Sequence, residues 1–243
     1  MSLREKTALV VGGGTGIGRA AALALAKAGA KVIVSGRREE PLREVVELNE
    51  GPGEILTRAA DLGDRQSTFD LVEWAEEQLG QIDIVVNSAG INVPKRSMEE
   101  LSPEDWDLLI NVNATGAYNL MHAVLPEMRK RGDGLIVNIS SVAGIRASTL
   151  GGVAYSASKF AMAALGLTAA LEDGHHGIRI SNIYPGEVET PILDKRPVPV
   201  SAEHRARILQ PEDVAAAVLL LAQLPARAHI PELTIKPTTQ DFA

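Results

Sequence analysis

A tyrosine and a lysine four residues apart are the first candidates for chemistry in this chain. Tyr155 and Lys159 belong to the segment YSASKF, and residues at this spacing lie on the same face of a helix. A tyrosine with its ordinary pKa of about 10 exchanges protons poorly at neutral pH, but a neighbouring ammonium favours the phenolate and lowers that pKa. The pair could therefore exchange a proton with a substrate oxygen. Alternatively, it is an ordinary pair on the surface of an amphipathic helix.

A glycine-rich turn near the N-terminus is the second candidate. The segment VVGGGTGIG joins an apolar run to an alanine-rich one, as between a strand and a helix. The N–H groups at a helix N-terminus attract phosphate, and glycine lets a pyrophosphate approach the backbone closely. We expect Gly12, Thr15, Gly16, Ile17 and Gly18 to bind a dinucleotide, although their spacing differs from the strict G-x-G-x-x-G pattern. A plain strand-to-helix turn is the alternative.

The residues after the second predicted strand select between cofactors. Many dinucleotide sites place an acidic residue there, against the ribose hydroxyls of the adenosine, whereas this chain has Arg37 and Arg38 in VIVSGRRE. A guanidinium binds a 2′-phosphate through paired charge-assisted hydrogen bonds, and a carboxylate repels it. We therefore predict a preference for NADP(H), with NAD(H) as the other cofactor. The two arginines could also simply begin a solvated helix.

The elements that must position these residues alternate between short β-branched runs and longer amphipathic runs. This alternation is typical of βαβ units and a parallel sheet. Runs such as IDIVV are continuous rather than alternating, as expected for strands covered by helices on both faces. We predict a single α/β domain over 1–243, a three-layer αβα sandwich with a doubly wound, mostly parallel seven-stranded sheet. Strands are expected at 7–12, 31–36, 54–59, 82–87, 134–140, 178–184 and 233–235, and helices at 17–28, 39–48, 67–78, 103–131, 154–173 and 211–224.

Composition argues against several other classes of protein. The formal net charge of −7 disfavours a nucleic-acid or anionic-membrane surface, because both need a basic patch. There is no cysteine for a disulfide, thiolate ligand or thiol nucleophile, and the histidines show no ligand spacing, so no metal is expected. The apolar run 214–224 is about half the length of a membrane helix, and no secretory signal is recognised. We expect a cytoplasmic protein.

The third predicted strand ends in AADLGD. Asp61 could accept hydrogen bonds from the adenine amino group, with Leu62 packed nearby. Equally, Asp61 could cap the next helix. The sequence does not separate these two roles.

Six motifs follow one another along the chain: the glycine-rich turn, NSAG, NVNATG, NISSVAG, YSASK and YPGEVET. In this order they closely resemble those of the short-chain dehydrogenase/reductase family in its single-domain form, over nearly the whole chain. The threonine that often precedes the first glycine is Val11 here. The resemblance implies a Rossmann fold and hydride transfer between a nicotinamide and a carbonyl or secondary alcohol of a small substrate.

The resemblance also implies catalytic roles. Ser141 would hydrogen-bond the substrate oxygen, and Tyr155 would give or take its proton. Lys159 would lower the Tyr155 pKa and hold the nicotinamide ribose, while Asn113 would anchor a water that relays protons.

Two of these assignments choose between neighbouring residues. Asn113 is preferred to Asn111, which lies about 200° away around a helix. Ser141 is preferred to Ser140, which would face the other side of the strand end.

Further cofactor contacts are implied at the ends of the fourth and sixth strands. The backbone there would line the ribose and the nicotinamide, with the Val188 backbone and the Thr190 hydroxyl holding the carboxamide. The residues implied are Asn87, Ala89, Gly90, Pro185, Gly186, Val188 and Thr190.

A proline-rich segment at about 190–210 is expected to be an irregular loop that covers the substrate. Its basic residues could attract a carboxylate or phosphate of the substrate, or they could form a solvated face. They are Lys195, Arg196, Arg205 and Arg207.

Two functions remain open on the sequence. The first is an NADP(H)-dependent oxidoreductase acting on a small molecule as a homodimer or homotetramer, because long helices of this kind pair across a two-fold axis in many relatives. The second is a dinucleotide-binding regulator or scaffold with the same fold and no useful turnover. The complete set of polar motif residues favours the enzyme.

Overall fold

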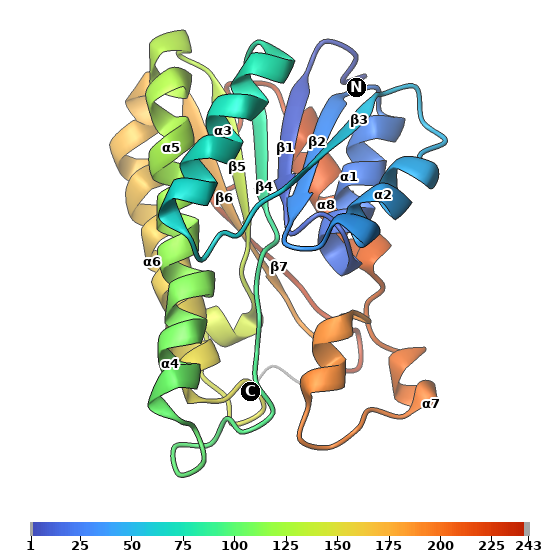
Figure 1. Cartoon of the computed structure of the whole chain (residues 1–243), viewed down its shortest axis with the longest axis vertical. Helices are drawn as coiled ribbons and strands as arrows, with labels where there is room; N and C mark the ends of the chain where they lie inside the picture. The colour runs from blue at the N-terminus through green and yellow to red at the C-terminus, as the bar shows by residue number, and fades with distance from the viewer. Residues whose placement is uncertain (1, 241–243) are drawn as a thin grey trace.

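The computed structural model describes residues 2–240 and contains one seven-stranded sheet, in the order β3-β2-β1-β4-β5-β6-β7 (Figure 1). All neighbouring strands are parallel. This confirms the predicted doubly wound α/β fold. The strands are β1 (Thr7–Val11), β2 (Lys31–Gly36), β3 (Ile55–Ala59), β4 (Ile84–Asn87), β5 (Gly134–Ile139), β6 (Ile178–Pro185) and β7 (Glu232–Ile235).

Helices cover both faces of the sheet. Helices α1, α2 and α8 pack on one face and α3, α5 and α6 on the other (Figure 1). The helices are α1 (Gly16–Lys27), α2 (Glu39–Glu47), α3 (Arg65–Leu79), α4 (Pro103–Ile110), α5 (Gly116–Arg131), α6 (Val153–Asp173), α7 (Ala202–Arg205) and α8 (Pro211–Gln223).

The continuous apolar strands divide their side chains between two cores. In β1, Ala8 and Val10 belong to the core beneath α1 and α8, whereas Leu9 and Val11 belong to the core beneath α3 and α5. Successive strand residues point to opposite faces, so a strand buried on both faces must be apolar at every position. The strand runs identified in the sequence owe their uninterrupted hydrophobicity to this geometry.

The residue that caps α3 differs from the one considered in the sequence. Asp64, not Asp61, is the N-cap residue, and its carboxylate accepts a hydrogen bond from the backbone N–H of Ser67 at 2.8 Å. Such a bond satisfies one of the N–H groups that a helix leaves unpaired in its first turn. Asp61 instead accepts a hydrogen bond from the backbone N–H of Gly63 at 2.9 Å.

The strand order changes direction between β1 and β4. In an open parallel sheet, ligands bind outside the carboxyl ends of the strands at such a switch point. The segments after β4, β5 and β6 all extend beyond that end, which is the lower one in Figure 1.

The segment expected to be an irregular covering loop has more order than the sequence suggested. Pro191–Lys195 forms a 3-10 turn, 202–205 forms the short helix α7, and Val188 pairs with Leu209 in an isolated β-bridge. The two ends of the segment are therefore joined, which returns the chain to the start of α8. Among the helices within residues 2–240, none is both long and apolar enough to cross a membrane.

Candidate active site

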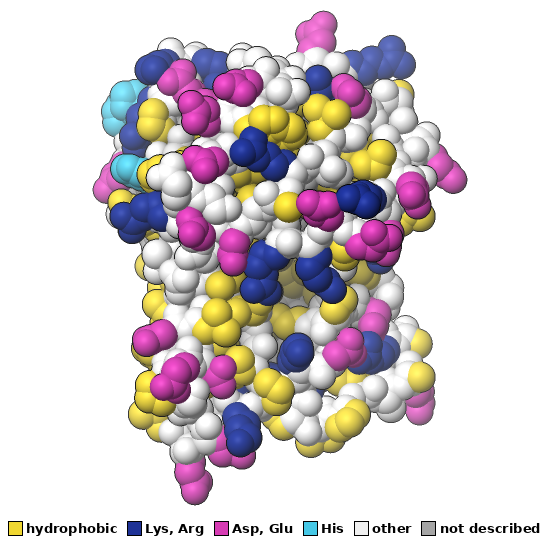
Figure 2. Space-filling model, viewed as in Figure 1, with side chains coloured by type: hydrophobic (Ala, Val, Ile, Leu, Met, Phe, Trp, Pro, Cys, Tyr) yellow, Lys and Arg dark blue, Asp and Glu magenta, His cyan; other side chains and the backbone are white. Residues whose placement is uncertain are grey.

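A cavity of about 520 Å³ opens at the carboxyl ends of the strands. It is lined by the glycine-rich turn, the ends of β2 to β6 and the segment that follows β6. Most of the expected site residues face it; Gly18, Asn87 and Asn113 lie behind its wall. The face shown in Figure 2 mixes acidic and basic side chains, and several basic ones gather around the hollow near its middle.

The glycine-rich turn has a conformation that favours glycine and leaves a helix N-terminus open. Gly12 and Gly16 have φ angles of +75° and +52°, a left-handed conformation that favours glycine. A Cβ atom on Gly18 would lie 2.2 Å from the Gly12 carbonyl oxygen, so only glycine lets the helix start this close to the turn. Helix α1 has no side-chain cap and no acidic residue in its first turn. Its N–H groups are therefore free to bind an anion.

Two arginines stand at the end of the cavity beside β2 and β3. Arg37 and Arg38 are exposed and line the cavity directly after β2. Neither takes part in any of the ion pairs found within residues 2–240, whereas the next residue, Glu39, pairs with Arg43. Asp61 and Leu62 line the same end of the cavity.

Asn113 lies in a π-helical turn, Asn111–Thr115, that separates α4 from α5. Its amide is fully buried: its oxygen accepts a hydrogen bond from Ile91 N–H at 2.9 Å, and its nitrogen donates to the Ile91 carbonyl and to Ser158 Oγ, both at 3.0 Å. Asn111 is exposed and donates to the Gly63 carbonyl at 2.8 Å. The two asparagines therefore point to different places, as the sequence predicted.

The structure brings Ser141, rather than Ser140, to Tyr155. The Ser141 side chain forms a hydrogen bond with the Tyr155 hydroxyl, and its oxygen also accepts one from Ala143 N–H at 3.1 Å. Ser140 is buried and donates to the Lys159 carbonyl at 3.2 Å, on the other side of the strand end.

The Tyr155 hydroxyl is poorly solvated. Burial raises its pKa above the ordinary value of 10.0, and the hydrogen bond from Ser141 and the charge of Arg96 act in the opposite direction. A phenol in this state keeps its proton at neutral pH. It is thus prepared to donate that proton when negative charge develops on a nearby oxygen.

Lys159 is a buried ammonium that meets no carboxylate within residues 2–240. Its side chain donates to the Ile139 carbonyl at 2.9 Å, and its nitrogen lies 5.8 Å from the centroid of the Tyr155 ring. Burial lowers its pKa to about 8. Its expected effect on the Tyr155 pKa stays a prediction.

Comparison with known proteins identifies the family. A sequence model of short chain dehydrogenases matches residues 6–198. The chain belongs to the short-chain dehydrogenase family. This oxidoreductase is 36% identical to the 3-oxoacyl-[acyl-carrier-protein] reductase FabG of Thermotoga maritima, over 91% of this chain and 92% of that one.

Two solved structures of similar proteins carry NADP or a derivative of it. An alcohol dehydrogenase from the archaeon Thermococcus sibiricus, complexed with 5-hydroxy-NADP, has 28% identity and a TM-score of 0.88 over 98% of this chain and 99% of that one. A metagenomic short-chain oxidoreductase in complex with NADP has 32% identity and a TM-score of 0.84 over 99% and 100% of the two chains.

Three residues of this candidate site were not identified in the sequence analysis. Ser158 donates to the Tyr155 carbonyl at 2.8 Å and accepts from Asn113, so it links the two. Gln240 lines the cavity and accepts a hydrogen bond from Glu187 N–H at 3.0 Å. Arg96 is buried beside Tyr155. Ser158 could have been found from its position one helical turn after Tyr155, but the other two come from loops with no motif.

Within residues 2–240, no group of three or more His, Asp or Glu side chains is arranged to hold a metal ion.

Proposed function

We propose that this protein is an NADP(H)-dependent oxidoreductase that transfers hydride between the nicotinamide and a carbonyl or secondary alcohol of a small substrate. The observation that carries this proposal is that the Tyr155–Ser141 pair and the glycine-rich turn line one continuous cavity. A dinucleotide whose pyrophosphate rests on the turn would extend toward the tyrosine.

The residues present fit such a cofactor. The turn would hold the pyrophosphate through backbone N–H groups, with the side chains of Arg37 and Arg38 at the 2′-phosphate. The 185–190 segment also lines the cavity and packs against the turn: a Cβ on Gly16 would lie 2.9 Å from Thr190 Cγ2. The bound nicotinamide supplies or accepts the hydride.

Besides the hydride, the reaction needs a proton, and side chains of this chain would transfer it. Ser141 orients the substrate oxygen, and Tyr155 donates its hydroxyl proton to that oxygen during reduction or removes it during oxidation. Lys159 supplies a buried positive charge that favours the transient phenolate. Asn113 holds the backbone of Ile91 and the hydroxyl of Ser158 in place and would anchor the water that returns the proton.

The test is turnover. The purified protein is mixed with NADPH and each member of a panel of ketones, aldehydes and oxo acids, and loss of NADPH absorbance is followed. We expect reduction of at least one carbonyl, with formation of its alcohol. Tight NADPH binding with no carbonyl reduced would instead favour a regulator or scaffold.

The cofactor preference has its own prediction. Replacing both Arg37 and Arg38 by glutamine should weaken NADPH binding by roughly 10- to 100-fold, the value of one or two charge-assisted hydrogen bonds. NADH binding should hardly change, because NADH lacks the 2′-phosphate. Fluorescence titration of both cofactors measures this.

The matched control is Arg43→Gln, which removes a basic side chain that pairs with Glu39 on α2 and does not line the cavity. Equal weakening of both cofactors in the double variant would contradict the proposed 2′-phosphate contact.

The assembly is also proposed, as a homodimer or homotetramer formed through α5 and α6. Tyr118 and Phe160 are 44% and 42% exposed on these helices, and Leu171 is 86% exposed. Such side chains on neighbouring helices are typical of a surface that another chain covers. Light scattering at micromolar concentration tests this, and a monomer would overturn it.

A further inference from the structure

One corner of the cavity holds a buried arginine whose charge is balanced by no carboxylate of the described residues. Arg96 follows β4, is only 7% exposed and lines the cavity together with Tyr155. It appears in none of the ion pairs within residues 2–240, and arginine is almost never buried without a partner of opposite charge.

Backbone carbonyls from three loops hold the Arg96 side chain. Its Nε donates to Val93 at 2.9 Å, one terminal nitrogen donates to Leu150 at 3.0 Å, and the other to Lys195. These bonds use three of the five N–H groups of a guanidinium. One N–H on each terminal nitrogen remains, and guanidinium N–H groups form strong hydrogen bonds with a carboxylate.

The surroundings add further positive charge. Burial lowers the pKa of Arg96, and Arg196, which also lines the cavity, is close enough to lower that pKa further by repulsion. The neighbouring acid, Glu187, already contacts Arg196 at 3.2 Å and His204 at 2.6 Å. Lys195 also lines the cavity, and its ammonium has no ion pair among the described residues.

The other two basic residues of the covering segment, Arg205 and Arg207, do not line the cavity. Arg205 pairs with Glu189 at 2.8 Å and also with Asp194. Arg207 pairs with Glu203 and does not line the cavity. Of the four basic residues noted in the sequence, only Lys195 and Arg196 face the cavity.

We propose that the substrate carries a carboxylate and that Arg96 binds it beside Tyr155, with Arg196 and Lys195 adding attraction. The inference rests on the proposed function, because it places the reacting carbonyl at Tyr155 and Ser141. The substrate is then an oxo acid in one direction and a hydroxy acid in the other. The carboxylate supplies the charge that the corner lacks, and because Arg96 is rigidly held, little side-chain entropy is lost on binding.

The experiment measures binding separately from turnover. The NADP⁺-loaded protein is titrated calorimetrically with 3-oxobutanoate, 4-oxopentanoate and 5-oxohexanoate, and with the methyl ester of each. These acids differ in the distance between carbonyl and carboxylate, and each ester removes only the charge. We expect at least one acid to bind about 10- to 100-fold more tightly than its ester, the value of charge-assisted hydrogen bonds.

Variants assign that preference to a residue. Arg96→Gln should abolish the advantage of each acid over its own ester, whereas Arg96→Lys should retain part of that advantage. Arg196→Gln should reduce the advantage of the acid by a smaller factor. If the Arg96 variants do not fold, this variant still tests whether the preference depends on the positive charge in this corner. The control, Arg207→Gln, removes an equal charge from the same segment outside the cavity and should have no effect.

The outcomes separate the two proposals. If no acid binds more tightly than its ester, or if the preference survives both Arg96→Gln and Arg196→Gln, the carboxylate site is wrong, whether or not neutral carbonyls are reduced. If acids bind preferentially but no carbonyl is reduced with NADPH, the carboxylate site stands and the proposed oxidoreductase function fails.

Discussion

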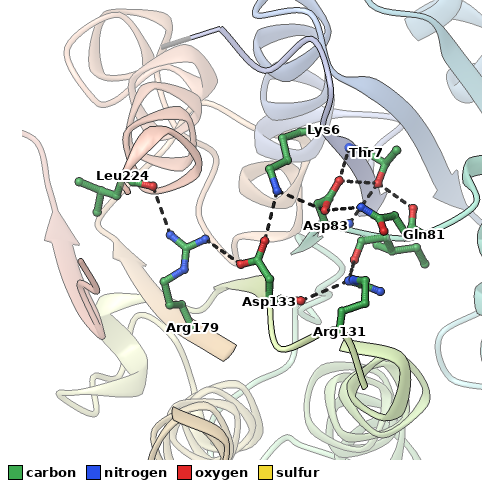
Figure 3. Close-up of polar contacts among 9 residues, drawn as sticks. Lys6, Thr7, Gln81, Asp83, Arg131, Asp133, Arg179 and Leu224 are labelled. Atoms are coloured by element: carbon green, nitrogen blue, oxygen red, sulfur yellow. Dashed lines mark hydrogen bonds and ion pairs between the residues drawn. The ribbon is translucent and has the colours of Figure 1, made fainter. Parts of the chain in front are cut away.

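At the amino ends of the strands, each buried charge meets a partner. Asp83, only 5% exposed, accepts hydrogen bonds from Thr7 N–H at 2.9 Å and from the Thr7 hydroxyl and Gln81 side chain at 3.0 Å (Figure 3). Lys6 bridges it to Asp133, with distances of 3.3 and 3.2 Å. This network joins β1, β4 and the turn before β5.

At the carboxyl ends, the buried cations Lys159 and Arg96 are held mainly by backbone carbonyls. Lys159 donates to the Ile139 carbonyl and Arg96 to three carbonyls, and neither meets a carboxylate among the described residues. Burial lowers the pKa of both groups. One sheet thus has an end whose charges are balanced internally and an end where, in our proposal, a bound anion would complete the balance.

The comparison teaches where stability and function lie in this fold. In a balanced network the charged groups stabilise the fold and have no unpaired charge to bind a ligand. Buried charges without a partner reduce the free energy of unfolding, and they are typical of binding and catalytic sites. Changes at the two ends should therefore have different consequences.

The largest expected effect comes from Tyr155→Phe. The variant should lose turnover by about 10²- to 10⁴-fold, the usual contribution of a general acid, since phenylalanine has no proton to donate. Its thermal unfolding and NADPH affinity should stay close to wild type. Steady-state kinetics with any accepted carbonyl measures the loss, and turnover near the wild-type rate would remove Tyr155 from the mechanism.

Asp83→Ala should act at the opposite end with the opposite result. It leaves the Thr7 N–H and the Lys6 ammonium without their buried acceptor, and the free energy of unfolding should fall by about 3 kcal/mol. The value of kcat/KM should hold within about two-fold, since a network balanced at this end has no part in the proposed proton transfer. Urea denaturation and kinetics give the two numbers.

The control for this variant is Glu54→Gln. Glu54 pairs with Lys31 at 3.3 Å where both side chains are well exposed, so the loss should be below about 1 kcal/mol. If both variants lose equal stability, the amino-end network has no special role.

The smallest expected effect is a pH dependence from Lys159. Burial lowers its pKa from 10.5 to about 8 in the folded protein, so between about pH 8 and 10.5 the unfolded chain binds a proton that the folded chain has released. The folded state without cofactor should therefore become more stable as pH rises through this window. Relative to Lys159→Met, the gain should be about 1 kcal/mol per pH unit.

Below pH 8 both states hold the proton, and the stability difference between wild type and variant should be flat. Urea denaturation at pH 7, 8, 9 and 10 measures it. Parallel curves over the whole range would show that the Lys159 pKa is unperturbed.

Local sequence motifs predicted most of the fold and most of the residues that line the cavity. The glycine-rich turn and the tyrosine–lysine pair depend on residues close in sequence, because turn conformation and helix periodicity are local properties. Continuous apolar strands predicted a sheet covered on both faces for the same reason. The Asn113 and Ser141 choices depended on the direction in which neighbouring side chains point, and the structure separates both pairs as expected.

Arg96 shows why other features were not predictable. In the sequence, PKRS resembles an exposed loop, since basic residues beside proline are usually solvated. Its burial depends on carbonyls near residues 93, 150 and 195, which are far apart in the chain and meet only once the sheet has formed. The same applies to the order within the covering segment, whose β-bridge joins Val188 to Leu209.

The π-helical turn at Asn111–Thr115 has a consequence for how such chains vary in length. A π turn holds one more residue than the α-helical turn it replaces, so removing one residue here would restore a regular helix running from 103 into α5. Each residue turns a helix by about 100°, and the shortened chain would lose the register that now turns Asn113 toward Ile91 and Ser158. Such a chain would keep its fold and its downstream motifs. In related sequences, the number of residues between SPEDW and NATG should therefore indicate the position of this side chain better than the presence of the asparagine alone.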